Sequence, residues 1–177
     1  QDLNKKLMGT SFLIQNSDKK SIQIDLKSKK GKEIALNLIK SADVFVENMR
    51  PGKAEALGLG WNQISAIHNK IVYCSISAYG QDGPFKKRGA YDHVVQGMTG
   101  IMTTTGTKES GPTKVGAPYI DYATGLNAAF AITAALHELN EQKKSIRVDV
   151  SMMDTSLLLM ANMVTEHLNS GWVPEPM

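Results

Sequence analysis

The stretch IVYCSIS at residues 71–77 decides the fold of this chain. Its β-branched and aromatic residues form a short run between polar neighbours, which is typical of a strand. Residues 21–26 alternate polar and apolar, and residues 43–47 form another short apolar run, so we predict a strand in each. Ser28 is the expected N-cap of a helix that runs to about residue 42. Strands and helices that alternate at this spacing predict parallel βαβ units, and hence an α/β fold with helices on the faces of a parallel sheet.

The second half of the sequence predicts more helices and one more strand. Residues 92–102 and 121–139 are expected to be helical, and the longer segment is rich in Ala and Gly. Residues 145–150 alternate as a strand does, and residues 154–168 have the apolar stripe of an amphipathic helix. The Gly- and Pro-containing residues 79–89 are expected to form a loop.

The composition narrows the class of protein. The chain has 177 residues, of which 42% are hydrophobic and 21% are charged, which is ordinary for one globular domain. No apolar run approaches the roughly 20 residues that span a bilayer, so no membrane partner is predicted. The single cysteine, Cys74, excludes an internal disulfide and indicates a reducing compartment. We therefore expect a cytoplasmic protein, or a mitochondrial or peroxisomal one in a eukaryote.

The charge is spread unevenly along the chain. Its net value is +3, and residues 1–60 hold eleven basic and seven acidic side chains. This mild basic excess suits a small anionic ligand and is too weak to predict a nucleic-acid partner. The chain begins at Gln1 instead of Met, and its last residues form no obvious closing element. We therefore predict a fragment of a longer protein.

Three segments follow predicted strands, where ligands bind in open α/β sheets. They are residues 25–27, 48–52 and 79–84. Lys27 and Arg50 lie in the first two and are candidates to meet an anion, with help from backbone N–H groups at helix starts. The alternative is structural, because Asn48 is a suitable helix cap and the glycines of these segments suit simple turns.

Asp121 is the most informative single residue, because it stands at the start of the long predicted helix. One interpretation is a simple helix cap. The other is a nucleophile, since a carboxylate that is fixed and kept ionised at a helix start is able to attack an activated acyl group. The small residues that follow allow a ligand or a second helix to approach closely, and both interpretations stay open at this point.

The remaining motifs exclude several chemistries. None of the four histidines is spaced for zinc, so no metal site is predicted. The sequence has no Gly-x-Ser-x-Gly elbow, no phosphate-binding P-loop and no complete dinucleotide fingerprint.

Four stretches, taken together and in order, resemble the family III CoA-transferases, the group that includes formyl-CoA transferase, carnitine CoA-transferase and α-methylacyl-CoA racemase. The resemblance extends from about residue 16 to residue 168. The stretches are residues 24–27 with Gly31, residues 42–48 with 50–52, residues 79–81 with 83–84, and residues 116–121 with Gly125.

The resemblance implies a Rossmann-like CoA-binding domain. Residues 1–177 would form part of this large domain, with the first strand before Gln1 and a distal small domain after Met177. Two full-length chains would interlock as a homodimer. CoA and acyl-CoA would be substrates together with carboxylic acids, and no cofactor would be permanently bound. The segment alone is expected to be inactive.

The resemblance also implies roles for particular residues. Asp121 matches the family's nucleophilic aspartate, which forms an acyl-aspartyl anhydride and then an aspartyl-CoA thioester. Tyr91 and Asp92 match a pair near the reacting acyl group. The CoA site would include two short segments, which comprise Ile24, Asp25, Leu26, Lys27, Asn48, Met49 and Arg50.

Tyr91 separates two activities within the family. Racemases of the family carry histidine at this position as the base that acts beside the carbonyl, so tyrosine favours transfer. The alternatives are an acyl-CoA racemase or isomerase of the same fold, and a non-catalytic CoA-binding module in which Asp121 is only a cap.

Overall fold

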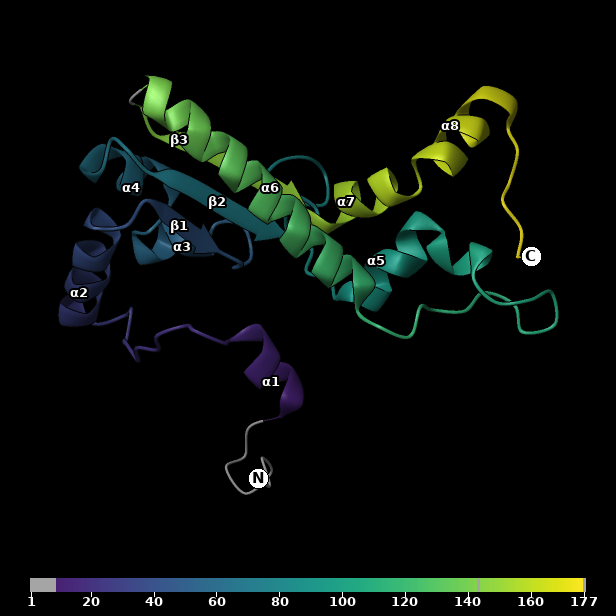
Figure 1. Cartoon of the computed structure of the whole chain (residues 1–177), viewed down its shortest axis with the longest axis horizontal. Coiled ribbons are helices and arrows are strands. Elements are labelled where there is room, and N and C mark those ends of the chain that lie inside the picture. The colour runs from purple at the N-terminus through teal and green to yellow at the C-terminus, as the bar shows by residue number, and fades with distance from the viewer. Residues whose placement is uncertain (1–8, 143, 177) are drawn as a thin grey trace.

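The computed structural model describes residues 9–142 and 144–176, and it has the α/β fold that the sequence predicts. Three parallel strands form one sheet in the order β1-β2-β3, and helices cover both faces (Figure 1). The strands are β1 (Val44–Glu47), β2 (Val72–Ser77) and β3 (Ile146–Ser151). The helices are α1 (Thr10–Gln15), α2 (Lys29–Lys40), α3 (Lys53–Leu57), α4 (Trp61–Ile67), α5 (Asp92–Thr99), α6 (Tyr119–Gln142), α7 (Met152–Leu159) and α8 (Ala161–Ser170), with a 3₁₀ turn η2 (Ile101–Thr104).

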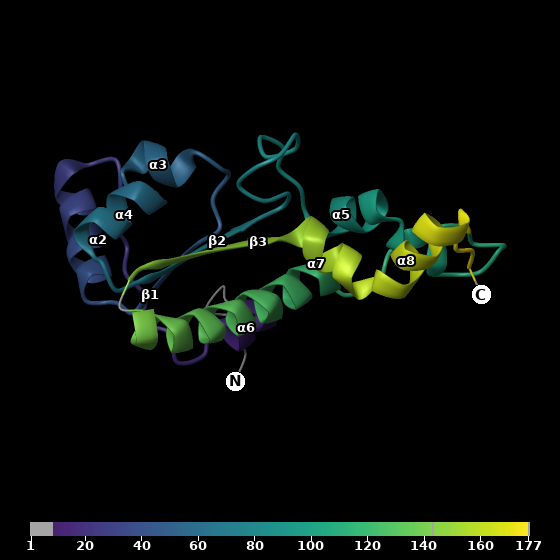
Figure 2. The same ribbon diagram turned by 90° about the horizontal axis from the view of Figure 1, so that it is seen from above.

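Strand β2 lies in the middle of the sheet and sends alternate side chains to opposite faces. Tyr73 packs with Ile64 and Ile39 under helices α2 and α4. Cys74 packs with Ala128 of α6 on the other face. Figure 2 shows this arrangement from above, with α3 and α4 on one side of the sheet and α6 on the other. Burial on both faces explains why residues 71–77 are a nearly continuous apolar run.

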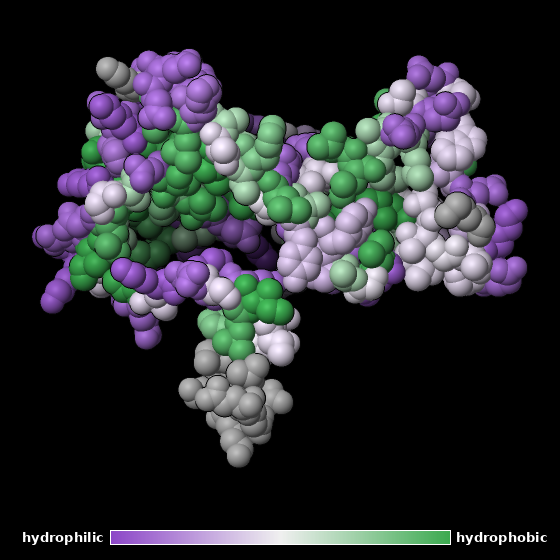
Figure 3. Space-filling view, in the orientation of Figure 1, coloured by the Kyte–Doolittle hydropathy of each residue, from purple (hydrophilic) through white to green (hydrophobic). Residues whose placement is uncertain are grey.

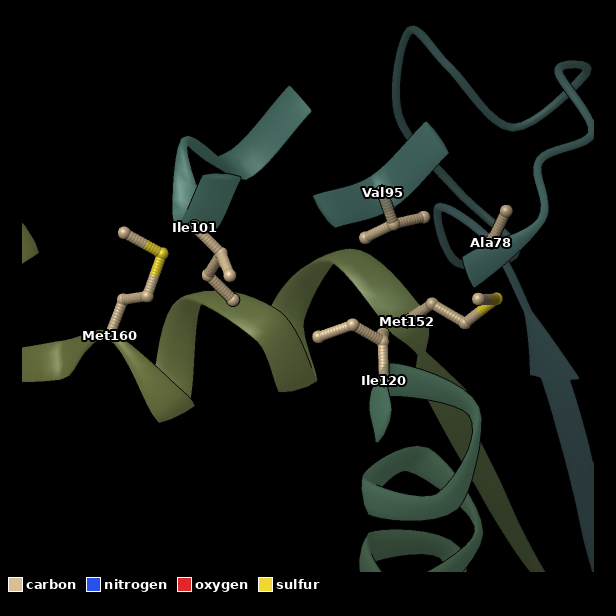
Figure 4. Close-up of a cluster of buried hydrophobic side chains, with 6 residues drawn as sticks. All are labelled: Ala78, Val95, Ile101, Ile120, Met152 and Met160. Atoms are coloured by element: carbon tan, nitrogen blue, oxygen red, sulfur yellow. The ribbon is translucent and has the colours of Figure 1, made fainter. Parts of the chain in front are cut away.

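A third apolar cluster fixes the helices beyond the carboxyl ends of the strands. It joins the end of β2 to α5, to the start of α6 and to α7 (Figure 4). Ile120 and Val95 are fully buried in it. Its six buried members are Ala78, Val95, Ile101, Ile120, Met152 and Met160. The cluster therefore holds the first turns of α5 and α6 at the sheet edge where ligands bind in such folds.

Three predicted elements differ from the structure. Residues 21–26 are not a strand: they form no ladder and end in a turn, because no strand of the described chain lies beside them. The helix predicted over residues 92–102 ends at Thr99, since Gly100 adopts a left-handed φ of 83°. The helix predicted over residues 154–168 is divided into α7 and α8 at Met160.

The surface carries exposed apolar side chains. On the face shown in Figure 3 they gather along α6, where Leu126 and Phe130 are 74% and 76% exposed. At the start of the same helix, the side-chain amide of Gln15 in α1 donates to the hydroxyl of Tyr122 at 3.0 Å. None of the helices in the described residues is both long and apolar enough to cross a membrane.

Gly31 makes the turn before α2 possible, and this yields a first prediction. Ser28 caps α2 by accepting from the backbone N–H of Gly31 at 3.0 Å, and a Cβ at Gly31 would collide with the carbonyl oxygen of Asp25. We expect Gly31→Ala to lower the free energy of unfolding by about 1–3 kcal/mol, because backbone must move to relieve the overlap. Urea unfolding measures the change.

The matched control is Gly116→Ala, since a Cβ there would meet nothing within 4 Å. Its free energy of unfolding should stay within about 0.5 kcal/mol of the parent value. If the two substitutions lowered the free energy of unfolding equally, the close approach of Gly31 to the Asp25 carbonyl would not be the reason why glycine is needed there.

Candidate active site

A cavity of about 580 Å³ opens where β1 and β2 end. Its lining comes from the loop after β1, the end of β2, the segment before α5 and the first turns of α6, together with Val94 of α5 and Met152 of α7. Five of the predicted site residues lie in this lining, namely Asn48, Met49, Arg50, Tyr91 and Asp121. Residues that are up to 73 positions apart in the sequence are therefore brought into one site, as the ends of neighbouring parallel strands require.

Asp121 lines the cavity from the first turn of α6, but it does not cap the helix. The cap is Asp92, whose Oδ2 accepts the backbone N–H groups of Ile120 at 2.8 Å and Asp121 at 3.1 Å. Within the described residues, no donor bonds to the carboxylate oxygens of Asp121. Since Asp92 satisfies the helix start, the Asp121 carboxylate is left available to a ligand.

The pKa of the Asp121 carboxyl is raised, whereas its position at a helix start suggests a lowered one. A helix start favours the ionised carboxylate. In the structure, partial burial raises the pKa of the Asp121 carboxyl, and the nearby Asp92 carboxylate raises it further. A carboxylate with a raised pKa is more basic, and therefore a stronger nucleophile once ionised.

Asp92 lies behind the cavity and not in its lining. Its side chain is 7% exposed, and the side-chain amide of Gln96, one turn later in α5, donates to its Oδ1. Gln96 in turn accepts the backbone N–H of Val115 at 2.9 Å. Asp92 therefore connects α5, the segment before α6, and the first turn of α6 through buried hydrogen bonds.

Tyr91 is largely exposed at the mouth of the cavity. It is the residue before α5, is 78% exposed, and stacks on the imidazole of His93 at a ring distance of 6.2 Å. His93 does not belong to the cavity lining.

The loop after β1 is fixed at two points. The side-chain amide of Asn48 donates to the carbonyl of Ile76 at 2.7 Å, which ties the end of β1 to the end of β2. The backbone N–H of Met49 donates to the carboxylate of Glu47, also at 2.7 Å. Glu47 is buried, and sequence reasoning missed it; the signal was an acidic residue at the last position of an apolar strand.

A second, more apolar cavity of about 460 Å³ adjoins the first at Asn48 and Met49. It lies between α2, β1 and the segment before α2, and Ile24 and Leu26 are in its lining. Asp25 and Lys27 are outside the lining and exposed, and the Asp25 carboxylate accepts the backbone N–H of Lys27 at 2.9 Å. The structure thus divides the predicted CoA residues between two adjoining cavities and the turn at their edge.

Two further residues of the first cavity were not predicted. Arg88 lines it from the loop before α5, and Gly89 lies against the Arg50 guanidinium, where a Cβ would be 3.2 Å from Nε. The available signal was a basic residue followed by glycine just before Tyr91. Among the residues that the structure describes, no three His, Cys, Asp or Glu side chains form a group suited to a metal ion.

The fold and the site define an α/β protein with a carboxylate-bearing cavity at the carboxyl end of its parallel sheet. Comparison with protein families matches residues 2–177 to CoA-transferase family III. The chain belongs to this family, which confirms the resemblance seen in the four sequence stretches.

Two relatives of this chain are named as CoA-transferases. Human succinyl-CoA:glutarate CoA-transferase is 38% identical over 159 residues, which are 90% of this chain and 36% of that protein. Formyl-CoA:oxalate CoA-transferase of Streptomyces avermitilis is 40% identical over 148 residues, which are 84% of this chain and 36% of that protein. The chain therefore spans little more than a third of the length of these curated relatives.

Solved structures agree with the fold. A CaiB/BaiF family protein from Brucella suis is 35% identical, with a TM-score of 0.86 over 90% of this chain and 42% of that chain. A hypothetical protein from Mycobacterium tuberculosis is 33% identical, with a TM-score of 0.87 over 97% of this chain and 49% of that chain.

Proposed function

We propose that this protein transfers CoA between carboxylic acids, with Asp121 as the nucleophile. One observation carries the proposal: Asp92 caps α6, so the Asp121 carboxylate faces a cavity without a hydrogen-bond partner among the described residues. Membership of CoA-transferase family III supports it. So do the human and Streptomyces relatives, which are named as CoA-transferases for pairs of acids.

The first half of the reaction moves CoA onto the protein. A carboxylate oxygen of Asp121 attacks the thioester carbonyl, the carbon–sulfur bond breaks, and CoA leaves as a thiolate with the bonding electrons. An acyl-aspartyl anhydride results. The thiolate then attacks the aspartyl carbonyl of the anhydride and expels the first acid as a carboxylate, which leaves an aspartyl-CoA thioester.

The second half reverses these steps with a new acid. Its carboxylate attacks the aspartyl carbonyl, CoA thiolate leaves, and a second anhydride forms. The thiolate attacks the acyl carbonyl of this anhydride, which gives the new acyl-CoA and restores the Asp121 carboxylate. The thioester energy is conserved because each acyl group passes directly between carboxylate and thiolate, without hydrolysis.

The two adjoining cavities support one orientation of the bound CoA molecule, with its nucleotide end at the apolar cavity and its thioester at Asp121. Lys27 stands exposed at the edge of the apolar cavity and suits the phosphates of the nucleotide end. Ile24 and Leu26 offer apolar surface next to it. The pantetheine arm would pass Asn48 and Met49, which line both cavities, and deliver the thioester to Asp121.

Tyr91 and Asp92 take different parts in this proposal. Tyr91 stands at the mouth of the cavity, where its hydroxyl is free to contact the acyl group. Asp92 acts through its bonds to the first turn of α6 and is a positioning residue for Asp121. The homodimer implied by the family resemblance also belongs to the proposal, and the exposed apolar side chains of α6 offer a surface for it (Figure 3).

Hydroxylamine trapping tests the activity. The protein from its complete reading frame is mixed with an acyl-CoA and hydroxylamine, which intercepts an activated aspartyl carbonyl as a hydroxamate. We expect peptide mass spectrometry to find the hydroxamate on Asp121, and only when acyl-CoA is present.

Two other outcomes would overturn the proposal. Exchange of the α-proton in deuterated water without trapping would indicate a racemase or isomerase. CoA binding with neither trapping nor exchange would indicate a non-catalytic module.

A further inference from the structure

We infer that Arg50 and Arg88 supply the positive charge of the cavity at Asp121 in a form that a bound acyl-CoA is unable to acylate. A lysine at either position would bring the same charge but would react with the thioester. This inference rests on the proposed function, because it takes an acyl-CoA thioester to be bound beside Asp121. It gives the two arginines a role in directing the acyl group to Asp121 alone.

The cations of this cavity differ from the ordinary cation of the chain. Among the 20 basic side chains of the sequence, seventeen are lysines and only three are arginines, namely Arg50, Arg88 and Arg147. Two of these three arginines line the cavity, whereas no lysine of the described residues does. Lysine would satisfy a need for positive charge alone, so this distribution indicates a property that arginine has and lysine lacks.

Lysines stand close to both arginines in the sequence but remain outside the lining. Lys86 and Lys87 directly precede Arg88, and both are exposed. Lys53, at the start of α3, is exposed three positions after Arg50. The same two segments therefore present arginine to the cavity and lysine to its surroundings.

Asp121 is the strongest nucleophile within the described lining. Neither cysteine nor histidine is among these lining residues. Cys74 belongs to β2, whose end lines the cavity, but its side chain is fully buried, and burial raises the pKa of its thiol to about 11. The hydroxyl groups of the lining are weak nucleophiles unless a base activates them. Arginine as the cation completes a lining that does not compete with Asp121 for the acyl group.

The side reaction of a lysine shows what this lining avoids. A neutral lysine amine attacks the thioester carbonyl, the carbon–sulfur bond breaks, CoA leaves as a thiolate, and the nitrogen gives up a proton to water. The product is a stable amide, so each event would remove one positive charge from the cavity permanently. The anhydride on Asp121 would acylate the amine in the same way and release the Asp121 carboxylate.

Arginine escapes this reaction because its guanidinium keeps its proton. At pH 8, about 0.4% of lysine side chains with an ordinary pKa are neutral, against about one in a million arginine side chains. A guanidinium group that shares the cavity would lower the pKa of a lysine there, since like charges disfavour the charged form. The neutral amine would then be more abundant than on an ordinary surface lysine.

Both guanidinium groups have defined places beside the cavity. Arg50 lies against Gly89, where a Cβ would be 3.2 Å from Nε, and Arg88 lies 4.6 Å from the centre of the Phe85 ring. Neither arginine takes part in an ion pair between described residues. An amine presented from either position to a bound thioester would react at a high effective concentration.

Arg88→Lys and Arg50→Lys test the inference by peptide mass spectrometry. The protein from its complete reading frame is incubated with acetyl-CoA at pH 8, and acetylation of each lysine is followed with time. We expect position 88 of the first variant to be acetylated at least tenfold faster than Lys87 of the same chain. Position 50 of the second variant should show the same excess. Free CoA in excess should suppress acetylation at these two positions and leave that of Lys87 unchanged.

Arg147→Lys is the matched control, because Arg147 is an exposed arginine of β3 outside the cavity lining. Position 147 should be acetylated no faster than Lys87, with or without free CoA. The inference fails for either cavity position at which acetylation is no faster than at position 147, or at which free CoA gives no protection.

The inference and the proposed function fail independently, because acetylation of a lysine needs only a bound thioester. Rapid, CoA-protected acetylation at positions 50 and 88 without a hydroxamate on Asp121 would overturn the proposed function and keep this inference. A hydroxamate on Asp121 with both positions unreactive would keep the proposed function and overturn this inference.

Discussion

Asp121→Ala is expected to abolish CoA transfer while CoA binding remains measurable. The substitution removes the protein side chain that acts as nucleophile in the proposed reaction, and loss of a covalent nucleophile lowers kcat by about 10³-fold or more. CoA affinity should change little, because its proposed contacts are in residues 24–27 and 48–50 and not on α6. Transfer is followed with an acyl-CoA and an acceptor acid, and CoA binding by calorimetry.

The control for this prediction is Asp82→Ala. Asp82 is an exposed carboxylate in the loop after β2, at 3.9 Å from Lys86 and outside the cavity lining. This variant should retain the parent rate and the hydroxamate on Asp121. Transfer that persisted in Asp121→Ala would show that the nucleophile is another residue.

The sequence could predict the elements whose pattern depends on burial. Residues 71–77 became the central strand because both faces of β2 are covered, and the cluster around Tyr73 is already visible as an apolar run. Residues 21–26 alternate polar and apolar as a strand does, but no strand of the described residues lies beside them, and a pattern alone does not state whether a ladder partner exists. Similarly, the break at Met160 is not marked by Pro or Gly, so it had no local signal.

The site was predictable only in part, because contacts between residues that are distant in the sequence leave no local pattern. The sequence places Asp121 at a helix start and leaves open whether it is a cap or a nucleophile. Whether Asp121 caps the helix depends on Asp92, which lies 29 positions earlier and reaches the same helix only in the folded chain. Arg88 was missed because its meaning comes from the cavity that it shares with Asp121, and no spacing rule connects the two residues.

Asp92→Asn is expected to shift the pH dependence of transfer to lower pH. Asp121 must be ionised to attack, so the rate falls as the pH drops through its pKa. The Asp92 carboxylate is one cause of the raised pKa of Asp121. Removing that charge lowers the pKa of Asp121, and the acid limb of kcat/KM moves to lower pH. A purely structural role for Asp92 would lower the rate without moving this limb.

The same substitution should also weaken the fold, and the partners of Asp92 explain why. An asparagine at position 92 must present its amide N–H₂ either to the donors at the start of α6 or to the side-chain amide of Gln96. Gln96 has no freedom to turn over, because its oxygen accepts the backbone N–H of Val115. One donor is therefore left facing another, at a cost of about 1–3 kcal/mol in the free energy of unfolding.

A double substitution separates the two effects. Asp92→Asn combined with Gln96→Glu gives the new amide an acceptor at position 96, which can still accept from Val115. Stability should return toward the parent value, as urea unfolding would show. The acid limb should stay below that of the parent, since the negative charge no longer lies against the backbone N–H of Asp121. An acid limb that stayed at the parent position in the single substitution Asp92→Asn, where no charge is added back, would show that the charge of Asp92 has no separate influence on the nucleophile.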